Sequence, residues 1–238
     1  MGVATVKSTP QHLGVIMDGN RRWAVANGLT ESEGHTKGCE VFGELLKWCL
    51  FEEIPHLSVY VFSTENAKRS KEEIAHIFSL VSDFFEKSKE CSINQGITYT
   101  IIGNKDILPS QTAKLIQEIN KGVGTNAKLN VQFALGYGGR DEIVRAVKAI
   151  GKNLLSGSLS LNDIDEDLVS NYLDTQNFPD VDLLIRTGAA HRLSNFMLWQ
   201  THYSEICFSD KLWPSFSESD FREAINFYVN NYKTQQGK

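Results

Sequence analysis

Short apolar runs alternate with longer segments of helical periodicity along the chain, and this alternation limits the fold more than any other feature. The apolar runs with the length of strands are 13–17, 57–62, 98–102, 129–134, 181–185 and 206–208. The segments with helical periodicity are 36–51, 72–93, 110–120, 140–154, 165–173 and 218–231. Because parallel strands need helical crossovers, the pattern predicts an α/β fold with a mostly parallel central sheet surrounded by helices. No repeat or linker divides the 238 residues, so we expect a single domain over residues 1–238.

The charge balance argues against a nucleic-acid-binding protein. The formal net charge is −5 at pH 7, so any polyanion must be held by local arginines rather than by a broad basic face. No apolar run is long enough to span a bilayer, and the first residues lack the apolar core of a signal peptide. The cysteines show neither a CxxC pair nor metal-ligand spacing, which is typical of a cytoplasmic protein.

The loop after the first apolar run carries the clearest chemical signal. The run 13–17 is followed directly by the segment DGNRR at 18–22. Ligands of open α/β sheets bind at the carboxyl ends of strands. The Asp18 carboxylate could therefore hold a divalent cation there, and the two arginines could hold phosphate oxygens. The alternative is structural, with Asp18 or Asn20 capping a helix that begins in this loop.

Two of the expected helices carry long apolar stripes. In 36–51 and in 72–93, large apolar side chains recur at a spacing that places them on one face. The stripe residues are Val41, Phe42, Leu45, Leu46, Cys49 and Leu50 in the first helix and Ile74, Ile77, Phe78, Val81, Phe84 and Phe85 in the second. Periodicity favours the interpretation that both stripes simply pack on the sheet. Two such helices could also splay and enclose an apolar tunnel.

Several further segments of the sequence belong to the same pattern as this first loop. They are GHTKG at 34–38, FSTENAKR at 62–69, IRTGAAHRLSNF at 185–196, LWQ at 198–200, YSE at 203–205 and LWP at 212–214. Together with DGNRRW at 18–23, they resemble the signature of the cis-prenyltransferase family, typified by undecaprenyl diphosphate synthase, over nearly the whole chain. The resemblance implies a parallel sheet with a hydrophobic tunnel and a homodimer. It also implies Mg²⁺-dependent joining of an allylic prenyl diphosphate to isopentenyl diphosphate with a cis double bond.

The resemblance also implies roles for individual residues. Asp18 would handle magnesium and leaving-group activation, and Glu205 would be a second carboxylate that reaches the metal. Asn66, with Ser63 nearby, would assist proton removal after coupling, and His35 would act beside the allylic diphosphate. The residues implied for the allylic diphosphate are Gly19, Asn20, Arg21, Arg22, Trp23 and Arg69, and those for the second diphosphate are Arg186, Arg192 and Ser194. Such donors suit the reaction because breaking the allylic carbon–oxygen bond develops charge on the departing diphosphate.

The chain departs from the family pattern mainly at substrate positions. Arg21 replaces a glycine, Glu31 replaces an arginine that helps hold the allylic diphosphate, and Ala67 replaces a tryptophan. The remaining departures are Gly136 for asparagine, Ala189-Ala190 for Gly-Glu, and an absent RFGG tail. These changes should weaken or retune regular chain elongation. The block NRRW, taken with Ala190, resembles the irregular lavandulyl-type branch, which couples two allylic units head to middle.

We therefore expect a short product, made by irregular coupling or as a short cis-prenyl diphosphate. The substrates would be dimethylallyl, geranyl, farnesyl or isopentenyl diphosphate. Val61, beside the phenylalanines of the second stripe, should block a long tunnel. A regular medium-chain cis-polyprenyl diphosphate synthase, a terpene cyclase or diphosphate lyase acting on one substrate, and a non-catalytic partner subunit stay open as alternatives. The retained Asp18 disfavours the last, because such subunits typically lose the first-loop aspartate.

Overall fold

The computed structural model describes residues 9–68, 70–104 and 109–236. A six-stranded sheet with the order β3-β4-β2-β1-β5-β6 forms its centre, and every neighbouring pair of strands is parallel. The strands are β1 (His12–Ile16), β2 (His56–Ser63), β3 (Ile97–Gly103), β4 (Leu129–Tyr137), β5 (Leu183–Arg186) and β6 (Glu205–Phe208). The predicted α/β fold and all of its expected strands are therefore confirmed.

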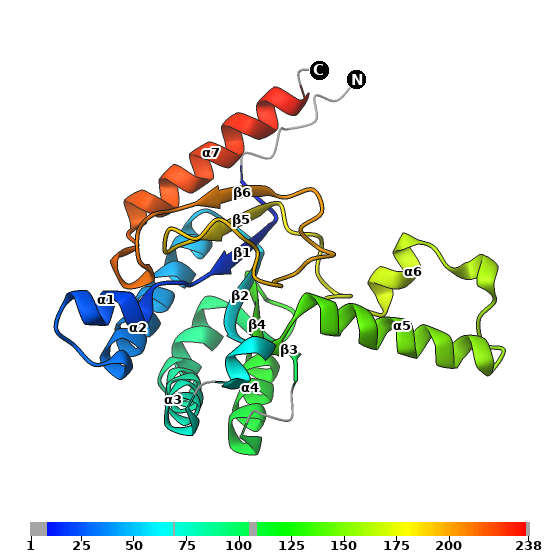
Figure 1. Cartoon of the computed structure of the whole chain (residues 1–238), viewed down its shortest axis with the longest axis horizontal. Coiled ribbons are helices and arrows are strands. Elements are labelled where there is room, and N and C mark those ends of the chain that lie inside the picture. Colours follow the sequence, from blue (N-terminus) through cyan, green and yellow to red (C-terminus); the bar gives the residue numbers. More distant parts are fainter. Residues whose placement is uncertain (1–8, 69, 105–108, 237–238) are drawn as a thin grey trace.

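Helices connect the strands and surround the sheet (Figure 1). They are α1 (Asn20–Ala26), α2 (Glu31–Phe51), α3 (Lys71–Gln95), α4 (Ser110–Val123), α5 (Gly139–Leu155), α6 (Glu166–Asn171) and α7 (Glu218–Gln236), with 3-10 turns η1 (Thr64–Lys68), η3 (Leu161–Asp163) and η4 (Trp213–Ser215). Helix α1 is not among the segments with helical periodicity, but it begins in the loop where the structural alternative placed a helix start. Helix α2 begins earlier than expected because Thr30 and Glu33 form a reciprocal capping box at its start. In the described residues, no helix is both long and apolar enough to cross a membrane.

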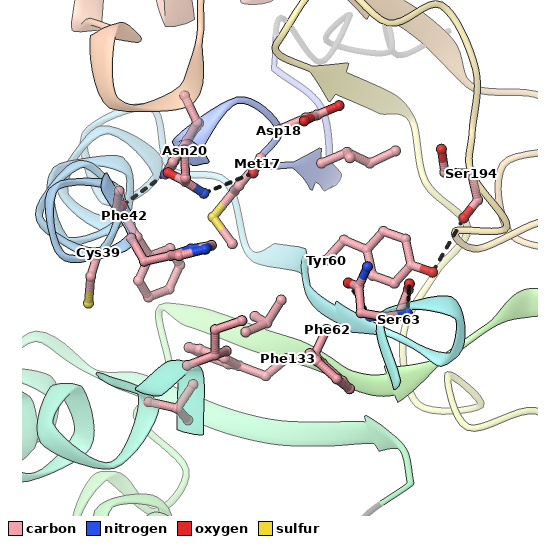
Figure 2. A pocket seen from close by; sticks show the side chains of 18 of the residues that line it. Met17, Asp18, Asn20, Cys39, Phe42, Tyr60, Phe62, Ser63, Phe133 and Ser194 are labelled. Atoms are coloured by element: carbon pink, nitrogen blue, oxygen red, sulfur yellow. Dashed lines mark hydrogen bonds between the residues drawn. The ribbon is translucent and has the colours of Figure 1, made fainter. Parts of the chain in front are cut away.

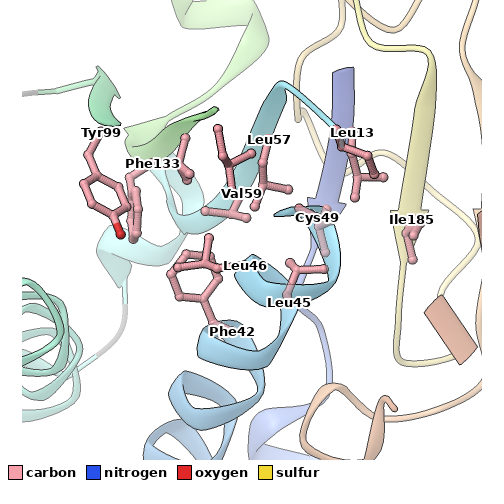
Figure 3. Close-up of a cluster of buried hydrophobic side chains, with 14 of the residues drawn as sticks. Leu13, Phe42, Leu45, Leu46, Cys49, Leu57, Val59, Tyr99, Phe133 and Ile185 are labelled. Carbon is pink, nitrogen blue, oxygen red and sulfur yellow. The ribbon is translucent and has the colours of Figure 1, made fainter. Parts of the chain in front are cut away.

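The two faces of the sheet bury different cores. Leu13 and Val15 of β1 point toward the larger core, which also contains side chains from α2, α3, α4 and α7. Figure 3 shows this contact, with Leu13 and Leu57 of the sheet facing Leu45 of α2. The alternate residues of each strand point to the opposite face, where a smaller core includes Phe196. Helix α5 extends away from the sheet, and α6 lies beside its distal part (Figure 1).

A polar ladder crosses this second face near the amino ends of the strands. His12 Nε2 lies 2.8 Å from Ser58 Oγ, which donates to Gln132 Oε1 at 2.9 Å, and all three residues are buried. His12 Nδ1 lies 2.7 Å from the Pro179 carbonyl oxygen. Burial penalises the imidazolium and lowers the pKa of His12 from 6.5 to about 4, so the ring is neutral at neutral pH.

The strand order decides where a ligand site forms. Strand β1 lies between β2 and β5, so the chain progresses to one side of β1 first and to the other side later. This arrangement creates a crevice at the carboxyl end of β1. Asp18 follows β1, Ser63 ends β2 and Arg186 ends β5, with Ile16 paired to both Tyr60 and Arg186. Segments distant in sequence therefore meet at one edge.

Candidate active site

The carboxyl ends of β1, β2 and β5 border a cavity of about 670 Å³, within the size range of small-molecule sites. In Figure 2, Asp18 and Ser194 lie on one side of this cavity, and Phe42 and Phe133 lie on the other. The polar lining includes Asp18, Arg186, Arg192 and Ser194, and the apolar lining includes Phe42, Ile77, Leu80, Val81, Phe84 and Phe133. The cavity is therefore suited to a molecule with an anionic head and an apolar tail.

Asp18 stands at the polar end between two arginines. Its Oδ1 accepts a hydrogen bond from Arg22 Nη2 at 3.1 Å, and its Oδ2 accepts one from Arg186 Nη2 at 2.9 Å. Its backbone N–H donates to Thr187 Oγ1 at 3.0 Å, and its carbonyl accepts from the Trp213 N–H at 3.0 Å. These contacts hold the carboxylate in one place while 31% of the side chain stays exposed to solvent.

Gly19 makes the tight turn that follows. Its φ of +118° lies in the region that favours glycine, and an added Cβ would approach the Leu212 Cα to 2.9 Å. Gly19 also occupies the N-cap position of α1, where no side chain accepts a capping hydrogen bond. The alternative interpretation of Asp18 or Asn20 as a helix cap is therefore wrong. Both side chains instead line the cavity.

Arg186 is a buried cation at the same edge. Only 3% of its side chain is exposed, and its Nη1 donates to Ser194 Oγ at 2.7 Å and to the Arg192 carbonyl oxygen at 2.5 Å. Its Nε is buried and has no hydrogen-bond partner within the described part of the chain. A buried guanidinium that shares its one carboxylate with Arg22 is incompletely satisfied. The site therefore suits an added anion such as a diphosphate.

The turn after β2 brings two further predicted residues into the cavity wall. The Ser63 N–H donates to Asn66 Oδ1 at 3.1 Å, and the Asn66 N–H donates to Ser63 Oγ at 3.2 Å. This reciprocal pair fixes both side chains at the start of η1. Both side chains line the cavity.

A second cavity of about 560 Å³ lies on the other side of Asp18 and is lined by Arg21, Arg22, Glu31 and His35. Arg21 Nη2 and Glu31 Oε1 are 2.6 Å apart, and about half of each side chain is exposed. Two of the departures from the family pattern are thus direct neighbours. The hydrogen bond to Glu31 raises the pKa of Arg21, and the positive charge at position 21 offsets the negative charge at position 31.

Aromatic rings close the apolar end of the larger cavity. The Phe42 ring centroid is 5.1 Å from that of Phe84 and 5.3 Å from that of Phe133. Phe85 and Tyr99 pack behind these three rings. Both apolar stripes therefore pack on the sheet, as periodicity favoured, and also enclose apolar space, which periodicity could not establish.

Comparison with known proteins agrees with this geometry. The family model described as "Putative undecaprenyl diphosphate synthase" matches residues 16–236. The chain belongs to the cis-prenyltransferase family. It is thus a prenyltransferase, an enzyme that condenses prenyl diphosphates.

Two relatives in sequence and one solved structure show which members of the family this cis-prenyltransferase resembles. The tritrans,polycis-undecaprenyl-diphosphate synthase (geranylgeranyl-diphosphate specific) of Thermoplasma volcanium is 43% identical over 92% of this chain and 86% of its own length. The ditrans,polycis-undecaprenyl-diphosphate synthase ((2E,6E)-farnesyl-diphosphate specific) of Micrococcus luteus is 38% identical over 94% of this chain and 90% of its own. The crystal structure of lavandulyl diphosphate synthase from Lavandula x intermedia in complex with dimethylallyl diphosphate superposes with a TM-score of 0.89. That structure is 33% identical and covers 94% of this chain and 97% of its own.

The structure gathers most of the predicted site residues of this cis-prenyltransferase. Those lining the larger cavity are Asp18, Asn20, His35, Ser63, Asn66, Arg186, Arg192 and Ser194, and the smaller cavity adds Gly19, Arg21 and Arg22. His35 borders both cavities, and its Nε2 lies 3.7 Å from Glu73 Oε1. Trp23 lies on α1 and lines neither cavity. Arg69 lies outside the described residues.

Glu205 is the predicted residue that the fold of one chain keeps away from Asp18. It begins β6 opposite Leu183 of β5, and Leu183 in turn pairs with Leu13 of β1. Leu13 and Asp18 are separated by roughly 16 Å of extended chain, at about 3.3 Å per residue. The Glu205 carboxylate accepts a hydrogen bond from Asn231 Nδ2 at 2.9 Å. Given this separation, a metal ion held by Asp18 would lie out of reach of Glu205 in the same chain.

Sequence reasoning missed several residues of the cavity wall. Tyr60 lines it, and its hydroxyl lies 3.2 Å from the Tyr137 carbonyl oxygen and 3.3 Å from the Ser194 carbonyl oxygen. Burial raises the pKa of Tyr60, so its hydroxyl stays protonated. Trp213 also lines the cavity and donates to the Gly38 carbonyl oxygen at 2.8 Å. The alternation of side chains along β2 could have indicated which face of the sheet carries Tyr60. No local pattern indicates the contact of Trp213 with α2.

Proposed function

We propose that this enzyme condenses an allylic prenyl diphosphate with isopentenyl diphosphate and makes a short-chain cis-prenyl diphosphate. One observation carries the proposal: a single cavity joins the Asp18–Arg186 edge to an apolar end that Phe42, Phe84 and Phe133 close. The polar edge suits diphosphates, and the apolar end limits how far a growing chain extends. The curated relatives at 38–43% identity carry names of regular synthases, which supports regular over irregular coupling.

The site contains two groups of hydrogen-bond donors, and we assign one group to the diphosphate of each substrate. We assign the second diphosphate to Arg186, Arg192 and Ser194, because Arg186 is buried and retains an unused N–H. The allylic diphosphate is assigned to the smaller cavity with Arg21 and Arg22. As the allylic carbon–oxygen bond breaks, its electron pair passes to the departing diphosphate. Donors held in place before the reaction stabilise this charge without reorganisation.

Asp18 is the residue suited to hold Mg²⁺ together with substrate phosphates. Magnesium is usually bound by one or two carboxylates together with substrate phosphates rather than by an all-protein cage. A single, partly exposed carboxylate beside the arginines fits that pattern. When bound, the ion would neutralise negative charge on the leaving diphosphate. The arginines then orient the phosphates, and the Ser63–Asn66 turn lies where a proton leaves the coupled chain.

Product analysis tests this proposal. The purified enzyme is incubated with dimethylallyl, geranyl, farnesyl or geranylgeranyl diphosphate and Mg²⁺, with and without isopentenyl diphosphate. We expect a short cis-prenyl diphosphate only when isopentenyl diphosphate is present. Long polyprenyl products would contradict the role of the closed apolar end. A hydrocarbon or an alcohol from one substrate would indicate a cyclase or lyase, and turnover only with an added partner protein would indicate a subunit role.

Irregular head-to-middle coupling is the second candidate. Two observations favour it: the TM-score of 0.89 to lavandulyl diphosphate synthase and the Arg21–Glu31 pair at the smaller cavity. A branched product formed from dimethylallyl diphosphate alone would establish it and would overturn the regular proposal. We further propose a homodimer, as the family resemblance implies. Sedimentation of the purified protein at the mass of a single chain would contradict that state.

A further inference from the structure

Asn195 lies where three separate segments of the active-site wall meet. It belongs to the loop after β5, directly after Ser194. Its backbone carbonyl accepts from the Gly139 N–H at 2.7 Å, and its Oδ1 accepts from the Arg140 N–H at 2.9 Å. Its Nδ2 donates to Glu65 Oε1 at 2.9 Å. One side chain thus connects the loop after β5, the start of α5 and the turn η1.

These contacts fix the orientation of the amide. Oδ1 must face α5, because the Arg140 N–H at the start of that helix needs an acceptor and the N-cap residue Gly138 supplies no side chain. Nδ2 must then face Glu65. The φ of Asn195 is +65°, a left-handed conformation that asparagine and aspartate adopt more readily than most other residues. The position therefore requires a short side chain with an acceptor toward the helix and a donor toward Glu65.

Both ends of the Asn195–Glu65 hydrogen bond adjoin proposed functional groups. On one side, Ser194 accepts from the buried Arg186 at 2.7 Å. On the other side, Glu65 precedes Asn66, which pairs with Ser63. Glu65 lines the cavity, and its Oε2 accepts from the Thr64 hydroxyl at 3.1 Å. Desolvation raises the pKa of Glu65, but hydrogen bonds from its own backbone, Asn195, Thr64 and Ser63 outweigh this effect and lower it.

We propose that Asn195 and Glu65 act as positioning residues. Their hydrogen bond, which we call the Asn195–Glu65 clasp, sets the distance between the diphosphate-binding loop at Arg186–Ser194 and the Ser63–Asn66 turn. The clasp is exposed to solvent, so it contributes little to folding stability. Its effect is geometric, because a displacement of about 1 Å between reacting groups lowers rates on the order of 100-fold. This inference rests on the proposed function of the same site.

Exchanging the donor and the acceptor tests the clasp. Asn195→Asp keeps the acceptor for α5 and tolerates the left-handed backbone, but it opposes a second carboxylate to Glu65. Combining it with Glu65→Gln restores a hydrogen bond, with the introduced amide now donating to the introduced carboxylate. Combining it with Glu65→Ala restores the original net charge but provides no hydrogen-bond donor at position 65. Comparison of the two double variants separates hydrogen bonding from charge.

The variants are compared by kcat, by KM for each substrate, by thermal unfolding and by calorimetric binding of inorganic pyrophosphate with Mg²⁺. We expect N195D to lower kcat/KM at least tenfold while the unfolding temperature changes little. N195D/E65Q should recover most of this loss, and N195D/E65A should not. Unchanged kinetics in N195D, or equal recovery in both double variants, would overturn the clasp.

Failure of the clasp is distinguishable from failure of the proposed function. A wild-type enzyme that makes no prenyl product from any substrate pair contradicts the proposed function. The pyrophosphate titration then still decides the clasp. Weaker binding in N195D that N195D/E65Q alone restores supports it, and identical binding in all variants refutes it.

Discussion

Replacing Phe84 by alanine should lengthen the product. The Phe84 ring closes the apolar end of the cavity, 5.1 Å from the Phe42 centroid and 6.1 Å from the Phe133 centroid. Phe84→Ala removes a six-carbon ring from the cavity wall, slightly more than the carbon content of one isoprene unit. We therefore expect the main product to gain about one five-carbon unit, if the surrounding side chains collapse only partly into the space.

The cost in stability should be tolerable. Truncating a fully buried phenylalanine costs about 3–5 kcal/mol. Phe84 is only partly buried, because one side of its ring faces the cavity, so we expect roughly half of that cost, about 2 kcal/mol. At about 2–4 °C per kcal/mol, the unfolding temperature should fall by roughly 4–8 °C. The variant should stay folded at assay temperature.

Phe85 provides a matched control. It neighbours Phe84 in the sequence and in the aromatic cluster, but it is fully buried and packs against Tyr99 instead of lining the cavity. Phe85→Leu should cost about 1–2 kcal/mol and leave product length unchanged. Products are dephosphorylated and sized by mass spectrometry. An active Phe84→Ala enzyme with wild-type product length, or equal lengthening in Phe85→Leu, would refute the closed-end argument.

Other predictions concern the polar edge and the buried ladder. Asp18→Asn should lower kcat by on the order of 100-fold or more without loss of folding, and wild-type turnover by this variant would contradict the role of the carboxylate. Arg192→Ala should lower kcat/KM more than Arg21→Gly, because Arg192 lines the main cavity while Arg21 lines only the smaller one and is paired to Glu31. The reverse ranking in steady-state kinetics would argue against it. For His12, the pKa of about 4 in the folded protein lies below 6.5, so the unfolded chain binds its proton first as the pH falls. Folding stability should drop by about 3 kcal/mol between pH 6.5 and pH 4, a contribution that His12→Gln should abolish in urea unfolding experiments.

Much of the site was predictable because its residues follow strands. The runs before Asp18, Ser63 and Arg186 were recognisable as strands from apolar content alone. Once these strands are parallel, their carboxyl ends must lie at one edge. Glu205 shows the limit of that reasoning. It begins its strand instead of following it, so the same parallel order carries it toward the opposite end of the sheet.

The sequence by itself determined the alternating elements, the parallel sheet and the edge at which the charged loops meet, because these follow from local periodicity and from the direction of the chain. Only the tertiary structure decided the contact of Arg21 with Glu31, the ring closure by Phe42, Phe84 and Phe133, and the three-way contact of Asn195. Each of these depends on the separation between side chains from different elements. Such separations arise from the packing of helices on the sheet, and no local pattern encodes them.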